Sequence, residues 1–411
     1  MQQQNKALTT MLIIIRVFVG LLFIFSGLIK ANDPWGLAYK MGEFFEIWGN
    51  KEHFMPSLML WLDNYKLFFS ITMVTFEIIA GMALIIGYRF KLFAYLILLL
   101  TIFFTFLTAY ALFSGNIKEC GCFGDCIKLQ ANESFMKDLI LLALLLILVF
   151  FKKHVAQAFS YKIANIVMIA TLVLTLFIQW YALKHLPFKD CLAYKVGNNI
   201  NTEMKPGPTY VAAEIKSVLT YKNKQTGKLE DFDQTNFPWE DTLHWEYADT
   251  KNIEVKAAQN EPTVKDFVIN SYDGVDVTQT ILTYPGNVFV LFVKDAEEAN
   301  TSNMDALRKL EAECKKTNIP LIGVSASNDI ATTAFNKKNN LTIPFFTIDG
   351  TASKTAMRSN PGLMLLKRGT IIGKWSYAGY PEMESLKLDL TDNATSLFIS
   401  TPPPVMDSIA N

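Results

Sequence analysis

Five long apolar runs fill most of the first half of the chain, and short polar segments separate them. They cover residues 11–29, 67–87, 92–113, about 135–151 and 163–183. An α-helix needs about 17–25 residues to cross the hydrocarbon core of a bilayer, and each run is of that order. The pattern therefore predicts an α-helical membrane bundle of five transmembrane helices.

After the last run the pattern changes. Alternating residues on either side of a turn predict a hairpin at 213–232, and 243–257 predicts a further strand pair. From residue 261, predicted strands and helices alternate: strands 287–293, 319–327 and 343–349, helices 301–316 and 328–339, a hairpin at 361–376, and a last helix from about Pro381. Such alternation predicts an α/β domain, with a sheet covered by helices.

The charges between the apolar runs predict the orientation of the bundle. Residues 88–91 and 152–162 carry basic residues and no acidic ones, whereas 30–66 and 114–134 mix both signs. Basic loops without acids favour the cytoplasm. With five spans, the N-terminus is then cytoplasmic, and everything after about residue 184 lies outside.

Composition narrows the class of partner. Hydrophobic residues make up 51% of the 411 positions, and they concentrate in the first half, which is typical of a membrane region followed by a water-exposed one. Lys plus Arg and Asp plus Glu are equal at 38 each, so there is no basic excess to bind nucleic acid. We expect the lipid bilayer as a partner, and no nucleic acid.

The segment "KECGCFGDCIKL" (118–129) concentrates candidate chemistry between the third and fourth runs. It holds Cys120, Cys122 and Cys126, and Cys191 follows the last run by about eight residues. All four face outward in the predicted topology, where thiols tend to oxidise, so disulfide chemistry is favoured over structural zinc. A metal site is further disfavoured because His185 alone among the histidines lies near the outer face.

Four cysteines allow three pairings, and the sequence does not choose among them. A Cys120–Cys122 bond is the least favoured, because one intervening residue scarcely permits disulfide geometry. A Cys122–Cys126 bond, or a bond from this segment to Cys191, is easier to build. Eight extended residues reach at most about 28 Å. We therefore predict that Cys191 lies beside residues 120–126 and can form a disulfide there, which would serve either redox exchange or structure.

Ionisable residues inside the runs are a second candidate site, because buried charges in a membrane are usually paired and often functional. Arg16 lies in the first run and Glu77 in the second. A buried Arg16–Glu77 pair that fixes helix register is one interpretation, and a proton relay or a quinone contact is the other. Lys30, and Lys137 with Asp138, lie at outer ends, where snorkelling accounts for them.

Residues 31–66 are rich in aromatics, including Trp35, Trp48 and Trp61. This composition predicts helices at the outer membrane interface. Such a lid could also shelter a lipid-soluble cofactor.

Three stretches together resemble the DoxX and MauE-like family of small membrane proteins. They are the loop "CGCFG", "RVFVGLLFIFSGLIKANDPWG" (16–36) and "FEIIAGMALIIG" (76–87), and the resemblance covers about residues 10–155. It implies assistance in disulfide formation during the maturation of methylamine dehydrogenase, with Cys120 and Cys122 as the family's cysteine pair. The whole layout resembles a DoxX-type arrangement of Bacteroidetes, which implies that the outer side is the periplasm.

The order of elements after residue 261, with "NPG" before the hairpin, resembles a thioredoxin-like domain of the peroxiredoxin-related kind. Pro361 would match that fold's cis-proline. Active members place Cys-x-x-Cys after the first strand, but here Glu297 and Asn300 stand where those cysteines would fall. Cys314 shares a helical face with Met304, Leu307 and Leu310, which predicts a buried core thiol.

We thus expect three parts: a DoxX/MauE-like bundle at 1–186, a β-rich linker at 187–260, and a periplasmic thioredoxin-like domain without Cys-x-x-Cys at 261–400. The bundle would sit in the bacterial inner membrane.

The function expected from this layout is thiol–disulfide exchange, or maturation of periplasmic or membrane partner proteins. A quinone is the candidate electron acceptor, with Arg16 and Glu77 as candidate contacts. The alternative is a non-enzymatic scaffold, whose cysteines are structural and whose thioredoxin-like domain binds other proteins.

Overall fold

A computed structural model describes residues 2–49, 55–114, 123–127, 129–256, 258 and 260–394. Cys120 and Cys122 lie outside the described residues. Two compact units make up the chain: Asn198–Phe267 is one, and the residues before and after that segment form the other.

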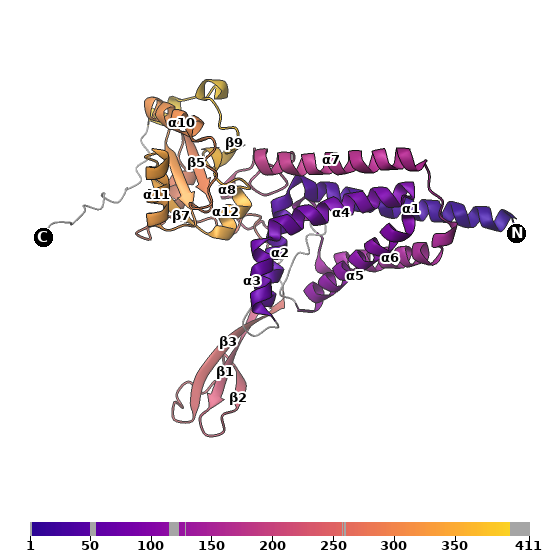
Figure 1. The fold of residues 1–411 in the computed structure, drawn as a ribbon. Coiled ribbons are helices and arrows are strands. Elements are labelled where there is room, and N and C mark those ends of the chain that lie inside the picture. The colour runs from indigo at the N-terminus through magenta and orange to yellow at the C-terminus, as the bar shows by residue number, and fades with distance from the viewer. Residues whose placement is uncertain are drawn as a thin grey trace. The chain divides into compact units, whose positions relative to one another are not determined.

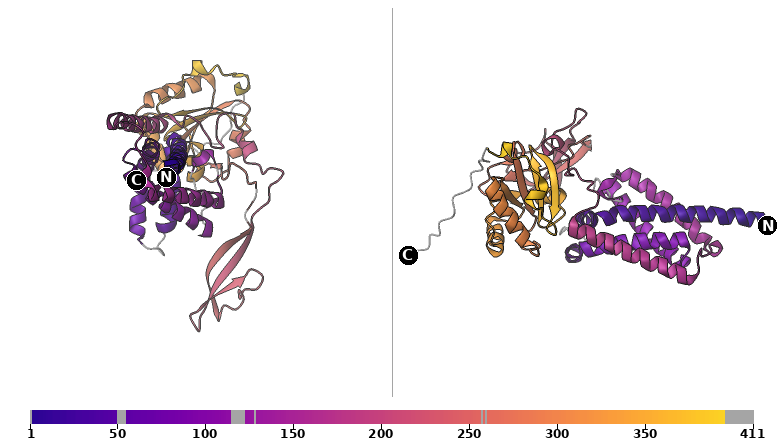
Figure 2. Two further views of the ribbon diagram at one scale, coloured as in Figure 1. Left: turned by 90° about the vertical axis from the view of Figure 1, so that its right-hand side faces the viewer. Right: turned by 90° about the horizontal axis from the view of Figure 1, so that it is seen from above.

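Helices build the N-terminal region (Figure 1). They are α1 (Gln2–Asn32), α2 (Pro34–Gly49), α3 (Pro56–Asn64), α4 (Lys66–Ile86), α5 (Phe90–Ser114), α6 (Ala131–Phe150) and α7 (Tyr161–His185). α1, α4 and α7 lie side by side, as do α5 and α6 (Figures 1 and 2). The predicted aromatic helices at 31–66 are present as α2 and α3.

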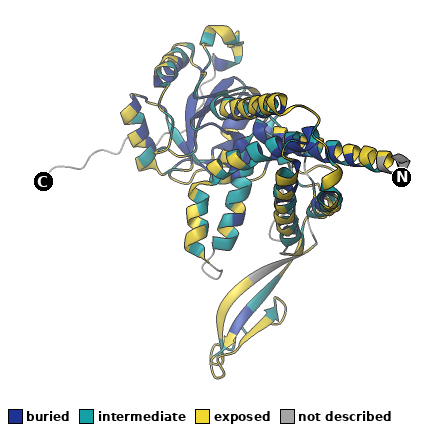
Figure 3. Ribbon diagram, turned by 45° about the vertical axis from the view of Figure 1, so that its right-hand side comes forward, coloured by how far each residue is buried: buried dark blue, intermediate teal, exposed yellow. Residues whose placement is uncertain are grey.

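Four of these helices are long and apolar enough to cross a membrane. The segments are Lys6–Asn32, Lys66–Ile86, Phe90–Phe113 and Tyr161–His185. The fourth predicted run forms α6, which is not among them because its first two turns carry Glu133, Lys137 and Asp138. Much of the surface of these helices is exposed (Figure 3). Large apolar side chains such as Ile14 and Phe18 are among the exposed residues, as expected for contact with lipid.

Close backbone contact joins α1 to α4. A Cβ atom on Gly20 would lie 2.7 Å from the carbonyl oxygen of Gly81, and one on Gly81 would lie 2.7 Å from that of Gly20. Small residues at such crossings let membrane helices approach closely. Farther along α1, Gly27 faces Ile78 and Glu77, so the two helices run antiparallel. α4 ends at Gly87, whose φ of 71° provides the left-handed C-cap.

The C-terminal part is a six-stranded sheet with helices packed on it. Its strands are β4 (Ile269–Asn270), β5 (Asn287–Val293), β6 (Leu321–Ser325), β7 (Phe345–Ile348), β8 (Gly362–Lys367) and β9 (Thr370–Ser376), in the spatial order β4-β7-β6-β5-β8-β9. β5, β6 and β7 are parallel, and β8 is antiparallel to both β5 and β9. This is the predicted α/β architecture.

Helices α10 (Met304–Thr317) and α11 (Asp329–Asn339) connect the parallel strands, as predicted. Every residue of β5 is buried and the strand lies inside the sheet, so β5 is at the centre of the core. Cys314 packs in this core as predicted, and burial raises the pKa of its thiol to about 12. The Asn360–Pro361 peptide is cis, which confirms the prediction for Pro361.

Four features of this domain differ from the predictions. β4, α9 (Thr278–Leu282) and α12 (Gly350–Ala356) were not predicted, because they are too short to show a hydrophobic period. The helix predicted from about Pro381 is wrong. Among the described residues there, only the 3₁₀ turns Met383–Leu386 and Thr391–Ala394 form.

The unit Asn198–Phe267 contains the short helix α8 (Ile200–Glu203) and a three-stranded antiparallel sheet in the order β2-β1-β3. β1 (Glu214–Asn223) and β2 (Leu229–Asp233) form the predicted hairpin. The strand pair predicted at 243–257 is wrong, because the segment is one strand, β3 (Trp245–Lys256), that pairs along β1.

Candidate functional site at the cysteine segment

A disulfide joins Cys126 to Cys191, with the two Cα atoms 4.8 Å apart. Cys126 ends a single 3₁₀ turn, Gly124–Cys126, that precedes α6, and Cys191 follows α7. The bond confirms the prediction that Cys191 reaches the cysteine segment. Cys126 is exposed, whereas Cys191 is half-buried.

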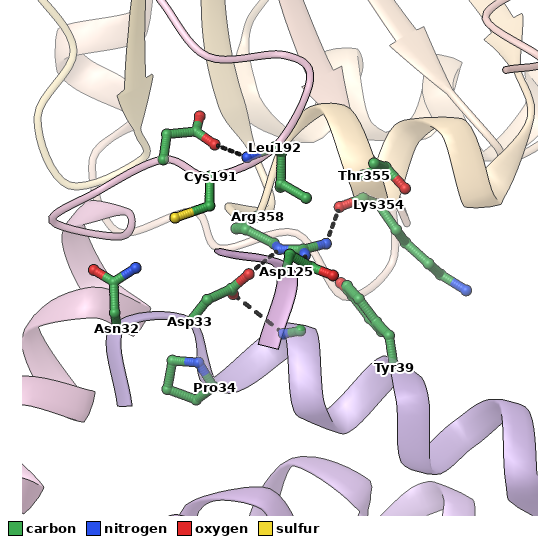
Figure 4. A network of polar contacts seen from close by, with 12 residues as sticks. Asn32, Asp33, Pro34, Tyr39, Asp125, Cys191, Leu192, Lys354, Thr355 and Arg358 are labelled. Carbon is green, nitrogen blue, oxygen red and sulfur yellow. Dashed lines mark hydrogen bonds and ion pairs between the residues drawn. The ribbon is translucent and has the colours of Figure 1, made fainter. Parts of the chain in front are cut away.

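Arg358 connects the thioredoxin-like domain to this segment (Figure 4). Its Nε donates to Asp33 at 2.8 Å and its Nη2 to Asp125 at 2.7 Å, while Nη1 donates to the carbonyl of Lys354 at 2.8 Å. Asp33 lies between α1 and α2, and Asp125 directly precedes Cys126. One buried guanidinium thus holds two carboxylates from separate parts of the membrane region.

A second ion pair reaches the other cysteine. Lys374 of β9 contacts Asp190 at 2.6 Å, and the Lys374 side chain is only 8% exposed. Asp190 directly precedes Cys191, and Asn32 exchanges two hydrogen bonds with the backbone of Lys189. Each bonded cysteine therefore follows an aspartate that a cation of the C-terminal domain holds.

The charges at this contact shift one another's pKa values. Burial would lower the pKa of Arg358, but the carboxylates of Asp33 and Asp125 raise it above its usual value. Burial raises the pKa of Asp33 and outweighs the opposing effect of Arg358. Burial and the charge of Arg358 lower the pKa of Lys294 to about 7.

Lys294 directly follows β5, at the start of the loop where active thioredoxin-like proteins carry their thiols. Its ammonium lies 5.4 Å from the ring centre of Trp35 and donates to the hydroxyl of Tyr39 at 3.1 Å. It also donates to the carbonyl of Arg358 at 2.8 Å, beside the cis-proline. The domain thus packs this edge against α2 of the membrane region.

Glu297 and Asn300, which stand where the thioredoxin-like resemblance would place two cysteines, lie in the loop that follows β5. The backbone N–H of Asn300 donates to the carbonyl of Asn360 at 2.9 Å, and the Asn360 side chain donates to the carbonyl of Asp295 at 2.9 Å. Glu297 is exposed. Hydrogen bonds therefore join the loop after β5 to the loop that carries the cis-proline.

The membrane ion pair differs from the prediction. Glu77 is paired with Lys30, whose Nζ lies 2.6 and 2.8 Å from its two carboxylate oxygens, and the two side chains are 1% and 5% exposed. Arg16 instead donates to the carbonyl of Ala156 at 2.8 Å. The predicted Arg16–Glu77 pair is wrong because Glu77 faces Gly27, about 16 Å farther along α1 at 1.5 Å per residue. Snorkelling was also the wrong account of Lys30.

Sequence reasoning missed Arg358, Lys374 and the aspartates they hold. One signal was present: both bonded cysteines occur as Asp-Cys, in "GDC" and "KDC". Nothing in the sequence indicated which cations would meet them. Within the described ranges, no group of three or more His, Cys, Asp or Glu residues is placed to hold a metal ion.

Comparisons with known proteins cover both parts of the chain. Residues 8–151 match the family model described as methylamine utilisation protein MauE, and residues 215–257 match a domain of unknown function, DUF8463. No curated protein sequence matches the chain. A solved structure of BsSco, from the Sco family of cytochrome c oxidase assembly proteins, is similar at 14% identity and a TM-score of 0.26, over 32% of this chain and 93% of that one.

The family match covers α1 to α6 and includes the whole cysteine segment. The C-terminal part of the chain is an α/β domain with a six-stranded sheet and a cis-proline before β8. The chain therefore joins a membrane region, which is similar to the MauE family over residues 8–151, to a C-terminal α/β domain with a cis-proline before β8.

Proposed function

We propose that this protein exchanges disulfides with partner proteins on the outer side of the bacterial inner membrane, through Cys120, Cys122, Cys126 and Cys191. The observation that carries the proposal is the Cys126–Cys191 bond. It uses two of the four cysteines and leaves Cys120 and Cys122 in the same short segment.

Exchange would proceed by attack of a thiolate on one sulfur of the disulfide. A partner thiolate attacks Sγ of Cys126, which is the more exposed of the two residues, the bond to Cys191 breaks, and Cys191 leaves as a thiolate. A second partner thiolate then attacks the partner's own sulfur in the mixed disulfide and releases Cys126. The partner loses two electrons and gains a disulfide, while Cys126 and Cys191 gain those electrons as two thiols.

Cys122 gives the protein an internal route as well. Its thiolate can attack Sγ of Cys126, which forms a Cys122–Cys126 bond and frees Cys191 without net oxidation. That step removes the covalent link between the cysteine segment and the chain that enters the outer domain. Arg358 and Lys374 would keep the two segments together while the bond is open, and so act as positioning residues.

The ion pairs also favour a second candidate function. Since Arg358 and Lys374 fix both Asp-Cys dipeptides, the disulfide could serve only to lock the domain onto the bundle. In that case the protein is a scaffold, and its thiol-free domain binds partners. The state of the thiols separates the two functions.

The first test is trapping of a mixed disulfide in cells. With Cys120 and Cys122 changed to Ser, the additional change Cys191→Ser leaves Cys126 with no resolving cysteine. We expect this variant to accumulate disulfide-linked adducts that disappear on reduction and contain partner peptides. The matched variant Cys126→Ser, with half-buried Cys191 remaining, should give at least several-fold less adduct. The scaffold would be favoured if both variants formed equally few adducts and if the Cys126–Cys191 bond of the unmodified protein stayed closed under all redox conditions.

The second test asks on which side of the membrane the cysteines lie. The proposed topology has five transmembrane helices, one of which is α6. We expect a membrane-impermeant maleimide to label Cys126 and Cys191 in reduced whole cells, because both follow outward-facing ends. A cysteine introduced at Lys152 should be labelled only after the membrane is opened. The reverse result would place the cysteine segment in the cytosol and remove the basis for the proposed function.

A further inference from the structure

Arg16 of α1 is a buried cation with no acidic partner among the described residues. Its side chain is 6% exposed, and its Nη1 donates to the carbonyl of Ala156 at 2.8 Å. A guanidinium has five N–H donors. In the same described ranges the other nitrogens have no hydrogen-bond partner, and Nε is enclosed by protein. A buried charge with unused donors is costly, so its surroundings favour an acceptor from outside the chain.

The unused edge of this guanidinium has the geometry for a phosphate group. Since Nη1 is bonded to Ala156, Nε and Nη2 remain, and two neighbouring guanidinium nitrogens can donate in parallel to two oxygens of one phosphate. Gly87 allows the close approach, because a Cβ atom there would lie 2.7 Å from Nη1. Residues 155–160 form no helix or strand and are mostly exposed, so this segment can move aside for a head group.

Arg16 lies at the end of the helical region away from the disulfide. Its neighbours Gly87 and Ala156 belong to the α4–α5 turn and to the connection between α6 and α7, which lie at the end where α1 begins (Figures 1 and 2). Tyr95, near the start of α5, and Tyr161, the first residue of α7, are 46% and 67% exposed there. Tyrosines of membrane proteins gather at the level of the lipid head groups. Their position indicates that Arg16 lies near the depth of the lipid phosphates.

The charge of this end selects the kind of lipid. The turn 88–91 and the connection 152–162 contain no acidic residue, and their lysines and arginines are Arg89, Lys91, Lys152, Lys153 and Lys162. A zwitterionic head group would bring its ammonium among these cations, with no carboxylate to receive it. Phosphatidylglycerol or cardiolipin brings only negative charge. Basic pockets between membrane helices bind anionic head groups for this reason.

We propose that Arg16 is the centre of a binding site for the phosphate of an anionic phospholipid. Nε and Nη2 hold two oxygens of the phosphate, and Nη1 keeps its hydrogen bond to Ala156. The cations of the turn 88–91 and of the connection 152–162 attract the head group to this end of the bundle. The lipid thereby joins α1 to the connection between α6 and α7. This site is independent of the proposed thiol exchange and uses none of its cysteines.

The test is native mass spectrometry of the full-length protein in detergent, titrated separately with phosphatidylglycerol and with phosphatidylethanolamine of the same acyl chains. We expect the first phosphatidylglycerol to bind several-fold more tightly. Arg16→Gln should weaken that binding by about tenfold or more, the loss expected when hydrogen bonds to a charged group are removed. Arg16→Lys keeps the charge without the paired donors and should give a smaller loss. Lys162→Gln is the matched control, since it removes one exposed cation from the same end, and it should weaken binding less than about twofold.

Gln157→Glu tests the site with Arg16 in place, should Arg16→Gln not fold, which thermal melting in detergent reports. It adds a carboxylate beside the guanidinium, because the Cα atom of Gln157 would lie 3.2 Å from a Cβ atom on Gly87. We expect it to weaken phosphatidylglycerol binding as Arg16→Gln does. Equal binding of the two lipids, or losses in Arg16→Gln and Gln157→Glu no larger than that in Lys162→Gln, would overturn the site. Displacement of phosphatidylglycerol by millimolar glycerol phosphate would overturn it in favour of a soluble anion.

Discussion

Arg358→Leu is expected to lower the free energy of unfolding by about 3–5 kcal/mol, the cost of removing one partner from a buried ion pair. The guanidinium is 8% exposed, and without it Asp33 and Asp125 are left as two neighbouring carboxylates at the same contact. Desolvation and mutual repulsion then both act against the folded state. The measurement is denaturant unfolding of the purified full-length chain in detergent, with the disulfide intact.

The matched control is Arg368→Leu in the same domain. Arg368 is 65% exposed and contacts Asp392 at the surface, so its loss should change stability by less than about 1 kcal/mol. The triple change Arg358→Leu, Asp33→Asn and Asp125→Asn should recover much of the lost stability, because no uncompensated charge remains. A loss for Arg358→Leu no larger than that for Arg368→Leu would show that the domain does not depend on this contact.

Local pattern was enough to predict most of the elements. The helices α1, α4, α5 and α7 are long, mainly apolar segments, and their limits differ from the predicted runs by a few residues, apart from the longer start of α1. β5 coincides with the predicted strand, since a short and wholly apolar run bounded by polar residues is typical of a buried parallel strand. The segment after Pro381 lacks such a signal.

The sequence was enough to predict that Cys191 lies close to the cysteine segment, because the short chain between α7 and Cys191 limits the distance between them. The ion pairs were not predictable. Arg358 and Asp33 are 325 positions apart, and the contact exists only because the tertiary fold brings the cis-proline loop to the start of α2. The partner of Glu77 depends on the register of α1 against α4, which Gly20 and Gly81 set through their close approach. Composition carries no information about that register.

Lys30→Leu is expected to cost about 3–5 kcal/mol of stability, because it leaves the carboxylate of Glu77, only 1% exposed, without its cation. Lys30→Leu combined with Glu77→Leu should recover much of that loss if the pair is structural. The coupling energy of this pair, from a double-mutant cycle, should then exceed about 1 kcal/mol.

Arg16 provides the control that distinguishes the observed pair from the one predicted. Like Lys30→Leu, Arg16→Leu replaces a buried cation with leucine. Arg16, however, donates to the carbonyl of Ala156 and lies away from Glu77 along α1. The cycle between Arg16→Leu and Glu77→Leu should therefore give a coupling within about 0.5 kcal/mol of zero, as found for distant sites without shared partners. A large Arg16–Glu77 coupling with none for Lys30–Glu77 would contradict the observed pairing.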